Sequence, residues 1–125
     1  MLGNVFSQLK GSFSLLLYFT NTVCMCSLIY VIFLLKIIIP IKPIKRLISA
    51  LIIQISTLWI SLNTLITRCT TQIKWDVKGL DRVLNIKNCL VISNHQSWAD
   101  IVALQTVFNK KIPFLKFFLK KELIW

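Results

Sequence analysis

The most prominent pattern in the chain is a long apolar run near its beginning. Residues 11–35 contain no charged side chain, and Phe13 to Leu35 forms the core of this run. A helix of about 18 or more apolar residues is long enough to cross a bilayer. The run is too long for a secretory signal peptide, and no small-residue cleavage site follows it. We therefore predict a membrane helix.

A second uncharged run, Leu47 to Thr67, is amphipathic. At about 100° per residue its large apolar residues fall on one face, and most hydroxyl and amide side chains fall on the other. Such a helix can lie in the bilayer interface with its apolar face towards the lipid. It can also span the bilayer while its small polar residues pack against the first helix.

The two runs are separated by a basic connector that contains Pro40 and Pro43, which interrupt helix and stiffen the chain. Only Lys10 and the amino terminus lie on the other side of the first run, whereas four basic residues lie in or next to the connector: Lys36, Lys42, Lys45 and Arg46. The positive-inside rule places the connector in the cytoplasm. If both helices crossed, the basic remainder would lie outside, so we favour a second helix that lies along the surface or re-enters.

The remaining residues indicate the beginning of an α/β domain. Strands are expected at Ile73–Val77 and Cys89–Ser93, and a helix from Trp98 to about Phe108. We therefore predict a membrane-anchored α/β protein, with an anchoring helical region at residues 1–68 and the N-terminal portion of an α/β domain at residues 69–125. Some 57 residues make at best a marginal core of their own.

The candidate chemistry lies directly after the second predicted strand. His95 is the only histidine of the chain, and Asp100 follows five residues later. An imidazole can take a proton from a hydroxyl near neutral pH, and a carboxylate can hold the tautomer that this requires. A continuous helix would turn the two side chains about 140° apart. A turn containing Asn94 and His95, with Ser97 as N-cap of the next helix, would let Asp100 face His95.

A helix start with a polar turn would give the same spacing without any catalysis. The string Asn-His-Gln-Ser-Trp-Ala-Asp, however, resembles the His-x4-Asp block of the glycerolipid acyltransferases, especially bacterial membrane-bound 1-acylglycerol-3-phosphate (lysophospholipid) acyltransferases. Residues 75–80 are similar to the short strand and turn that precede this block, and residues 111–123 to the segment that follows it. The resemblance covers residues 75–125.

The resemblance implies transfer of an acyl group from a thioester, acyl-CoA or acyl carrier protein, to the free hydroxyl of a lysophospholipid such as lysophosphatidic acid, in phospholipid biosynthesis or remodelling. It implies that His95 is the general base and that Asp100 orients it, with Asn94 and Ser97 as supporting motif residues. The acyl thioester is a co-substrate, and no cofactor is implied. The protein would then act at the inner or cell membrane, with its catalytic portion on the cytoplasmic face.

The later blocks of that family, which contact the substrate phosphate, do not occur in this sequence. We therefore expect the chain to correspond to the N-terminal part of a longer enzyme and to have little activity alone. The alternative is a small non-catalytic membrane protein, or the remnant of a truncated gene, that binds anionic lipid. The acceptor headgroup and the oligomeric state are not predicted.

The net charge of +11 favours an anionic partner. No nucleic-acid-binding signature accompanies it, so membrane lipids fit better than nucleic acid. Near the C-terminus lysines alternate with aromatic and aliphatic residues, and three of them are candidate contacts for lipid or CoA phosphates: Lys116, Lys120 and Lys121. A surface with solvated lysines is the alternative. One histidine and four scattered cysteines predict no metal site.

Overall fold

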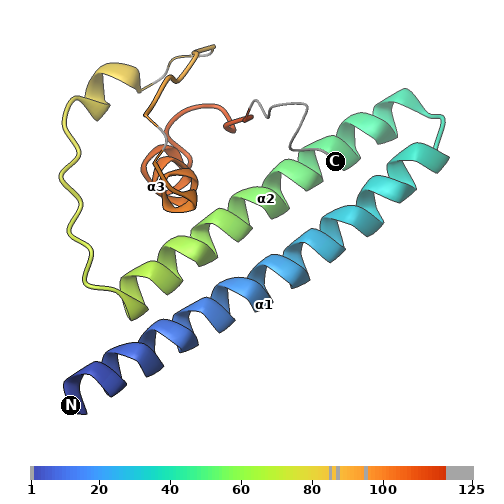
Figure 1. Cartoon of the computed structure of the whole chain (residues 1–125). Coiled ribbons are helices and arrows are strands. Elements are labelled where there is room, and N and C mark those ends of the chain that lie inside the picture. Colours follow the sequence, from blue (N-terminus) through green and yellow to red (C-terminus); the bar gives the residue numbers. More distant parts are fainter. Residues whose placement is uncertain (1, 85, 87, 95, 118–125) are drawn as a thin grey trace.

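The structure, a computed structural model, describes residues 2–84, 86, 88–94 and 96–117. Within these residues the order of elements is α1 (Leu2–Ile38), α2 (Lys42–Thr70), the short 3-10 helix η1 (Leu80–Val83) and α3 (Trp98–Phe108). The helices α1 and α2 form a long antiparallel hairpin, and the later elements lie along one side of it (Figure 1). The amino-terminal end of α1 therefore lies beside the carboxyl-terminal end of α2.

Two prolines determine where the hairpin turns. Helix α1 ends at Ile38, directly before Pro40, and α2 begins at Lys42 with Pro43 in its first turn. Proline at that position is compatible with helix because the first N–H groups of a helix have no partner within it. The predicted break is therefore confirmed, but α2 begins before Leu47, because Pro43 starts the helix instead of prolonging the connector.

The contact between α1 and α2 is a polar seam. Asn21 Nδ2 donates to Asn63 Oδ1 at 2.8 Å, and the Tyr18 hydroxyl lies against Thr67 Oγ1 and the carbonyl oxygen of Asn63. Nearer the open end of the hairpin, Ser14 Oγ lies 2.8 Å from the hydroxyl oxygen of Thr70. Polar residues of α2 thus pack against the first helix. This packing is what we expect if the second run spans the bilayer beside the first.

The hydroxyl groups of α2 are satisfied by its own backbone. Each hydroxyl donates to the backbone carbonyl oxygen four residues earlier, at 2.7 to 2.9 Å. The donor residues are Ser49, Ser56, Thr57, Ser61, Thr64, Thr67 and Thr70. Such bonds remove the cost of placing a hydroxyl in an apolar medium. They make this serine- and threonine-rich helix compatible with a bilayer.

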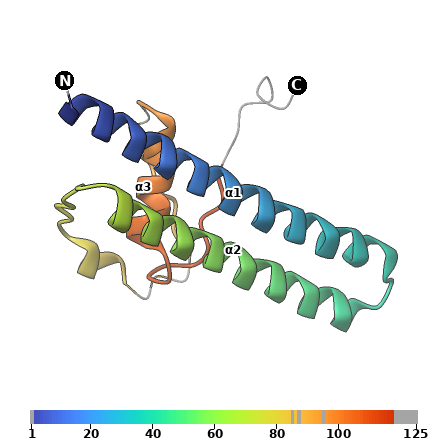
Figure 2. The ribbon, with the colours of Figure 1, turned by 90° about the horizontal axis from the view of Figure 1, so that it is seen from below.

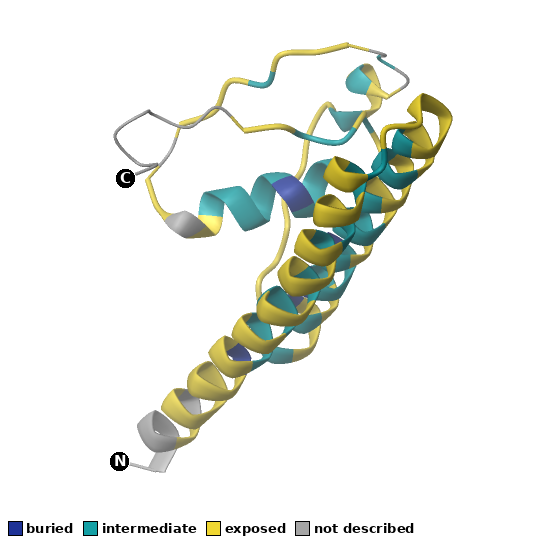
Figure 3. Cartoon of the chain, turned by 90° about the vertical axis from the view of Figure 1, so that its right-hand side faces the viewer, coloured by how far each residue is buried: buried dark blue, intermediate teal, exposed yellow. Residues whose placement is uncertain are grey.

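The hairpin exposes large apolar side chains and buries mainly polar ones, as expected of helices in a membrane. Most of the surface of α1 is exposed (Figure 3), and large apolar side chains such as Leu15 and Ile38 are 73% and 74% exposed. The residues that the structure buries are mainly polar, with Ile60 as the apolar exception among those described: Ser14, Asn63, Thr67 and Gln105. Residues 8–38 and 42–70 are each long and apolar enough to cross a membrane. Membrane association is therefore supported by both length and packing.

Helix α3 crosses the side of α2 in its C-terminal half and does not extend from its end (Figure 2). The chain reaches it through residues 71–97, which hold η1 and a turn at Gly79. Gly79 has φ of 73°, a left-handed conformation that glycine adopts without steric cost. The turn predicted next to this glycine is confirmed, and so is the helix from Trp98 to Phe108.

The two predicted strands are not formed. Residues 73–77 and 89–93 are extended or irregular, and the structure has no β-strand among the residues that it describes. The apolar patterns in these segments predict which residues avoid water, but a strand also needs a neighbouring backbone that supplies ladder hydrogen bonds. Within the described part of the chain neither segment has such a neighbour, so the α/β sheet of the predicted fold is absent there.

Candidate functional site

The predicted site surrounds the beginning of α3. Ser97 is the N-cap residue, and it forms a reciprocal capping box with Asp100 in the first turn. The Asp100 carboxylate accepts hydrogen bonds through Oδ2 from the backbone N–H groups of Gln96, at 2.6 Å, and Ser97, at 2.8 Å. A carboxylate in the first turn is also favoured by the helix dipole. The predicted cap and helix start are thus confirmed.

These hydrogen bonds give Asp100 a defined direction. Because its carboxylate binds the N–H groups of the two residues before the helix, it faces back over the turn that begins at Asn94 and does not extend along the helix. The carboxyl group is half-buried, whereas Asn94, Gln96 and Ser97 are exposed. His95 itself lies outside the described residues, so the proposed contact between its imidazole and Asp100 stays a prediction.

The predicted phosphate contacts are only partly described. Lys116 is exposed, and it lies in the segment that follows α3. Lys120 and Lys121 lie outside the described residues. The grouping of the three lysines into one basic surface therefore stays a prediction.

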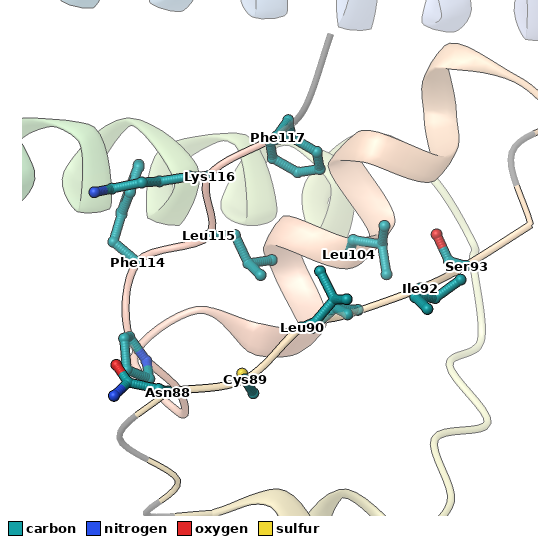
Figure 4. Close-up of a pocket in the computed structure, with 12 residues that line it drawn as sticks. Asn88, Cys89, Leu90, Ile92, Ser93, Leu104, Phe114, Leu115, Lys116 and Phe117 are labelled. Carbon is teal, nitrogen blue, oxygen red and sulfur yellow. The ribbon is translucent and has the colours of Figure 1, made fainter.

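An open apolar groove, which the sequence analysis does not predict, lies beside the motif. Its volume is about 650 Å³, which is within the range of about 300 to 1,000 Å³ typical of ligand sites. Two extended segments form its walls, residues 88–93 and 113–117, and Leu104 of α3 lies between them (Figure 4). The first wall leads directly into Asn94, so the groove ends at the predicted catalytic turn.

The groove residues were individually visible in the sequence as apolar positions. Leu90, Leu104 and Leu115 point into the space between the two segments (Figure 4). In the sequence, residues 89–92 were assigned to a strand and Phe114 to a basic aromatic surface. The sequence signal for a groove would have been the order of these segments, because two apolar segments flank one helix in the chain.

The described residues offer no metal centre. Among them, no group of three or more histidine, cysteine, aspartate or glutamate side chains is placed so that it could hold a metal ion. The four cysteines are all exposed and unpaired with one another. The site as far as it is described consists of a capped carboxylate, a polar turn and an apolar groove.

Comparison with known proteins gives one match. A family model with the description Acyltransferase matches residues 74–125, which include η1, the polar turn, α3 and the groove. Residues 74–125 are therefore similar to the acyltransferase family, and the resemblance predicted for residues 75–125 is confirmed at the level of that family. No curated protein and no solved structure matches the chain. The resemblance implies an α/β domain, whereas the residues of this segment that the structure describes form no strand.

Proposed function

We propose that this chain takes part in the transfer of an acyl group from a thioester, acyl-CoA or acyl carrier protein, to the free hydroxyl of a lysophospholipid such as lysophosphatidic acid. The observation that carries the proposal is the position of Asp100 inside the segment that matches the acyltransferase family. Its carboxylate is held by two backbone N–H groups on the side of the turn that contains His95.

The proposed mechanism is general base catalysis. The imidazole of His95 removes the proton from the acceptor hydroxyl as its oxygen attacks the thioester carbonyl carbon, and the thiolate leaves. Asp100 orients the imidazole and stabilises the imidazolium that forms, so both groups act together. The thioester carbon–sulfur bond breaks and an ester bond forms, with the proton passing from the hydroxyl to the departing thiol. No covalent acyl-protein is needed.

The groove supports a donor with an apolar chain. Its lining is predominantly hydrophobic, and two of its side chains, Leu90 and Ile92, are 72% and 86% exposed. Apolar surface of this kind is stabilised when it is covered, at about 25 cal/mol for each Å² removed from water. An acyl chain lying in the groove would cover these residues while its thioester end approached the turn at Asn94.

The packing of α3 on α2 supports the surface arrangement of the second helix. The end of α3 and the irregular residues 112–115 line a small pocket together with Ile53, Thr57 and Ile60 of α2. Irregular backbone does not face lipid in the hydrocarbon region, because its N–H and C=O groups would lack partners there. Protein thus covers only part of this side of α2, where Ile53 is 49% exposed, while Leu47 and Leu65, 71% and 55% exposed, are free for lipid on another side. A second helix that lies along the cytoplasmic surface of the cell membrane, the alternative favoured from the sequence, satisfies both conditions.

The test is a transfer assay on the chain reconstituted in vesicles that contain lysophosphatidic acid. Radiolabelled long-chain acyl-CoA and acyl carrier protein thioester are offered separately, and product is followed for hours because the rate is expected to be low. We expect product formation that is lost in His95→Ala and strongly reduced in Asp100→Ala. Equal product with the parent chain and with His95→Ala would reject acyl transfer and favour a lipid-binding role without catalysis.

A further inference from the structure

The face of α2 that meets α3 presents hydrogen-bond acceptors of fixed direction. Ser61 donates its hydroxyl hydrogen to the carbonyl oxygen of Thr57 at 2.8 Å, and Thr64 donates to that of Ile60 at 2.9 Å. A hydroxyl has one hydrogen and two lone pairs. Because both hydrogens are already used within α2, the two oxygens turn lone pairs towards α3.

Helix α3 and its C-cap supply the matching donors. Asn109 Nδ2 donates to Ser61 Oγ at 3.0 Å, and the hydroxyl oxygens of Thr106 and Thr64 are 3.2 Å apart. Since the Thr64 hydrogen is bound to Ile60, Thr106 acts as the donor in this pair. Gln105, next to Thr106, is among the few buried polar residues. The contact between the two helices is therefore directional as well as apolar.

Both hydrogen bonds lie at the end of α3 that is distant from the predicted site. Thr106 and Asn109 belong to its last turn and its C-cap, whereas Asp100 is in its first turn. An 11-residue helix is a stiff rod of about 16 Å. Fixing the end of a rod at two points fixes its direction, so the contacts with Ser61 and Thr64 also determine where the first turn lies.

Helix α2 also has an exposed apolar face that is suited to lipid. Leu51, Leu58 and Leu65 form an exposed stripe on it, separate from the residues that meet α3. A displacement of α3 along or around α2 would therefore change the depth of the catalytic turn relative to the bilayer. The acceptor hydroxyl of a lysophospholipid has its own depth in the headgroup region, and transfer requires the base to be within hydrogen-bond distance of it.

We propose that Ser61 and Thr64, with their donors Thr106 and Asn109, are positioning residues that hold the turn before α3 at the depth of the lipid hydroxyl. The consequence for catalysis rests on the proposed function, whereas the consequence for the position of α3 does not. None of the four residues touches the reacting atoms. They act through α3, at whose other end Asp100 lies.

The variants exchange donors for groups of the same shape. Asn109→Asp replaces the amide nitrogen by a carboxylate oxygen, which cannot donate to Ser61. Thr106→Val removes the second donor while keeping the volume. Thr106→Ser keeps the donor and is the conservative rescue, and Asn109→Ala removes the donor without adding charge. The exposed Gln72→Glu adds the same charge outside the α2–α3 contact and outside the groove, and is the matched control.

The measurement is the distance between two spin labels on the full chain in lipid nanodiscs. With the native cysteines replaced, one label is attached at Ala99→Cys, exposed in the first turn of α3, and one at Ala50→Cys, exposed on α2. The accessibility of the first label to oxygen and to a water-soluble nickel complex reports its depth. A second pair, at the exposed positions Thr20 and Gln54, reports whether the hairpin itself is intact.

We expect a single narrow distance distribution in the parent chain, Thr106→Ser and Gln72→Glu. In the double variant with Asn109→Asp and Thr106→Val the distribution should broaden, its mean should shift by several ångströms, and the depth should change, with the hairpin pair unaltered. If the hairpin pair also changes, the same comparison is made with Asn109→Ala. An unchanged α3 distance and depth, whether in the double variant or in Asn109→Ala, would overturn the proposal.

The transfer assay separates this result from the proposed function. If the label moves in the double variant, but the parent chain forms no more acylated product than His95→Ala, the positioning role stands and the proposed reaction is wrong. If transfer occurs and the label does not move, the reaction stands and the positioning is wrong. With both intact, the double variant should lose rate at saturating donor while the donor concentration for half-maximal rate changes little.

Discussion

Asn21 and Asn63 join the two long helices through a hydrogen bond of 2.8 Å between the amide nitrogen of one side chain and the oxygen of the other. Asn63 is 4% exposed, and Asn21 also donates to the carbonyl oxygen of Trp59. In a bilayer the hydrophobic effect does not drive helices together, so packing and hydrogen bonds of this kind determine how they associate. The pair therefore fixes the register of the hairpin.

The first prediction concerns this pair. Asn63→Ala should destabilise the hairpin by about 0.6 kcal/mol and at most about 1.7 kcal/mol, the range measured for hydrogen bonds between membrane helices. The loss is measured as the change in unfolding free energy in detergent micelles, and a double-mutant cycle with Asn21→Ala isolates the pair itself. Gln54→Ala, at an exposed position of the same helix, is the control. Equal losses at residues 54 and 63 would show that the seam does not depend on Asn63.

The second prediction tests the neighbouring contact of Tyr18. Its hydroxyl lies against Thr67 and the carbonyl oxygen of Asn63, so Tyr18→Phe should cost about 0.5 to 1.5 kcal/mol. Thr67 keeps its own bond to that carbonyl, which limits the loss. Tyr30, on the same helix, is 62% exposed and provides a matched control. Thermal unfolding of the two phenylalanine variants should separate them, and a lower midpoint for Tyr30→Phe than for Tyr18→Phe would contradict the seam.

The elements that could be predicted from the sequence are those whose signals are local. The uncharged run from Phe13 to Leu35 lies within α1, and the Ser97-x-x-Asp100 pattern marks the start of α3, because length, hydropathy and capping depend on neighbours in the chain. The segments at residues 73–77 and 89–93 were assigned to strands from equally local patterns. A strand, however, is stabilised by a partner that local patterns do not name.

The contacts between distant elements were beyond the sequence for a similar reason. The polar face of α2 was recognised, but its division into a side for α1, with Asn63, and a side for α3, with Ser61 and Thr64, depends on tertiary packing. The groove likewise requires two segments that are separated by α3 in the chain. For the catalytic block, residue types and spacing indicated Asp100 and its role as a cap, while the position of His95 stays a prediction.

The third prediction concerns the carboxylate at the start of α3. Asp100→Asn keeps the shape of the side chain but removes the charge that binds the N–H groups of Gln96 and Ser97. Charge-assisted hydrogen bonds are worth about 1.5 to 3 kcal/mol, roughly twice as much as neutral ones. Amide hydrogen exchange at residues 96 and 97 should therefore become about tenfold faster, because about 1.4 kcal/mol corresponds to a factor of ten in an equilibrium constant.

Asp81→Asn is the control for this measurement, since Asp81 also lies in the first turn of a helix, η1. It should leave exchange at residues 96 and 97 unchanged. Unaltered exchange in Asp100→Asn itself would mean that the capping box does not hold the turn, and the argument that Asp100 is directed towards residue 95 would lose its support.

The last prediction concerns the basic surface near the C-terminus. Replacing Lys116, Lys120 and Lys121 by glutamine should weaken binding to vesicles rich in phosphatidylglycerol at low salt, because each basic residue near an anionic surface contributes about 1 kcal/mol. The difference from the parent chain should disappear at about 1 M salt, where the screening length is only about 3 Å.

The control removes three charges from residues 74–82, by Lys74→Gln, Lys78→Gln and Arg82→Gln, so that net charge is matched. Lys78 already pairs with Asp76 at 3.2 Å, so one of these charges is partly compensated. If both triple variants lose binding equally, net charge alone attracts the protein to the membrane. If only the first loses it, the lysines at positions 116, 120 and 121 form a specific contact with lipid phosphates.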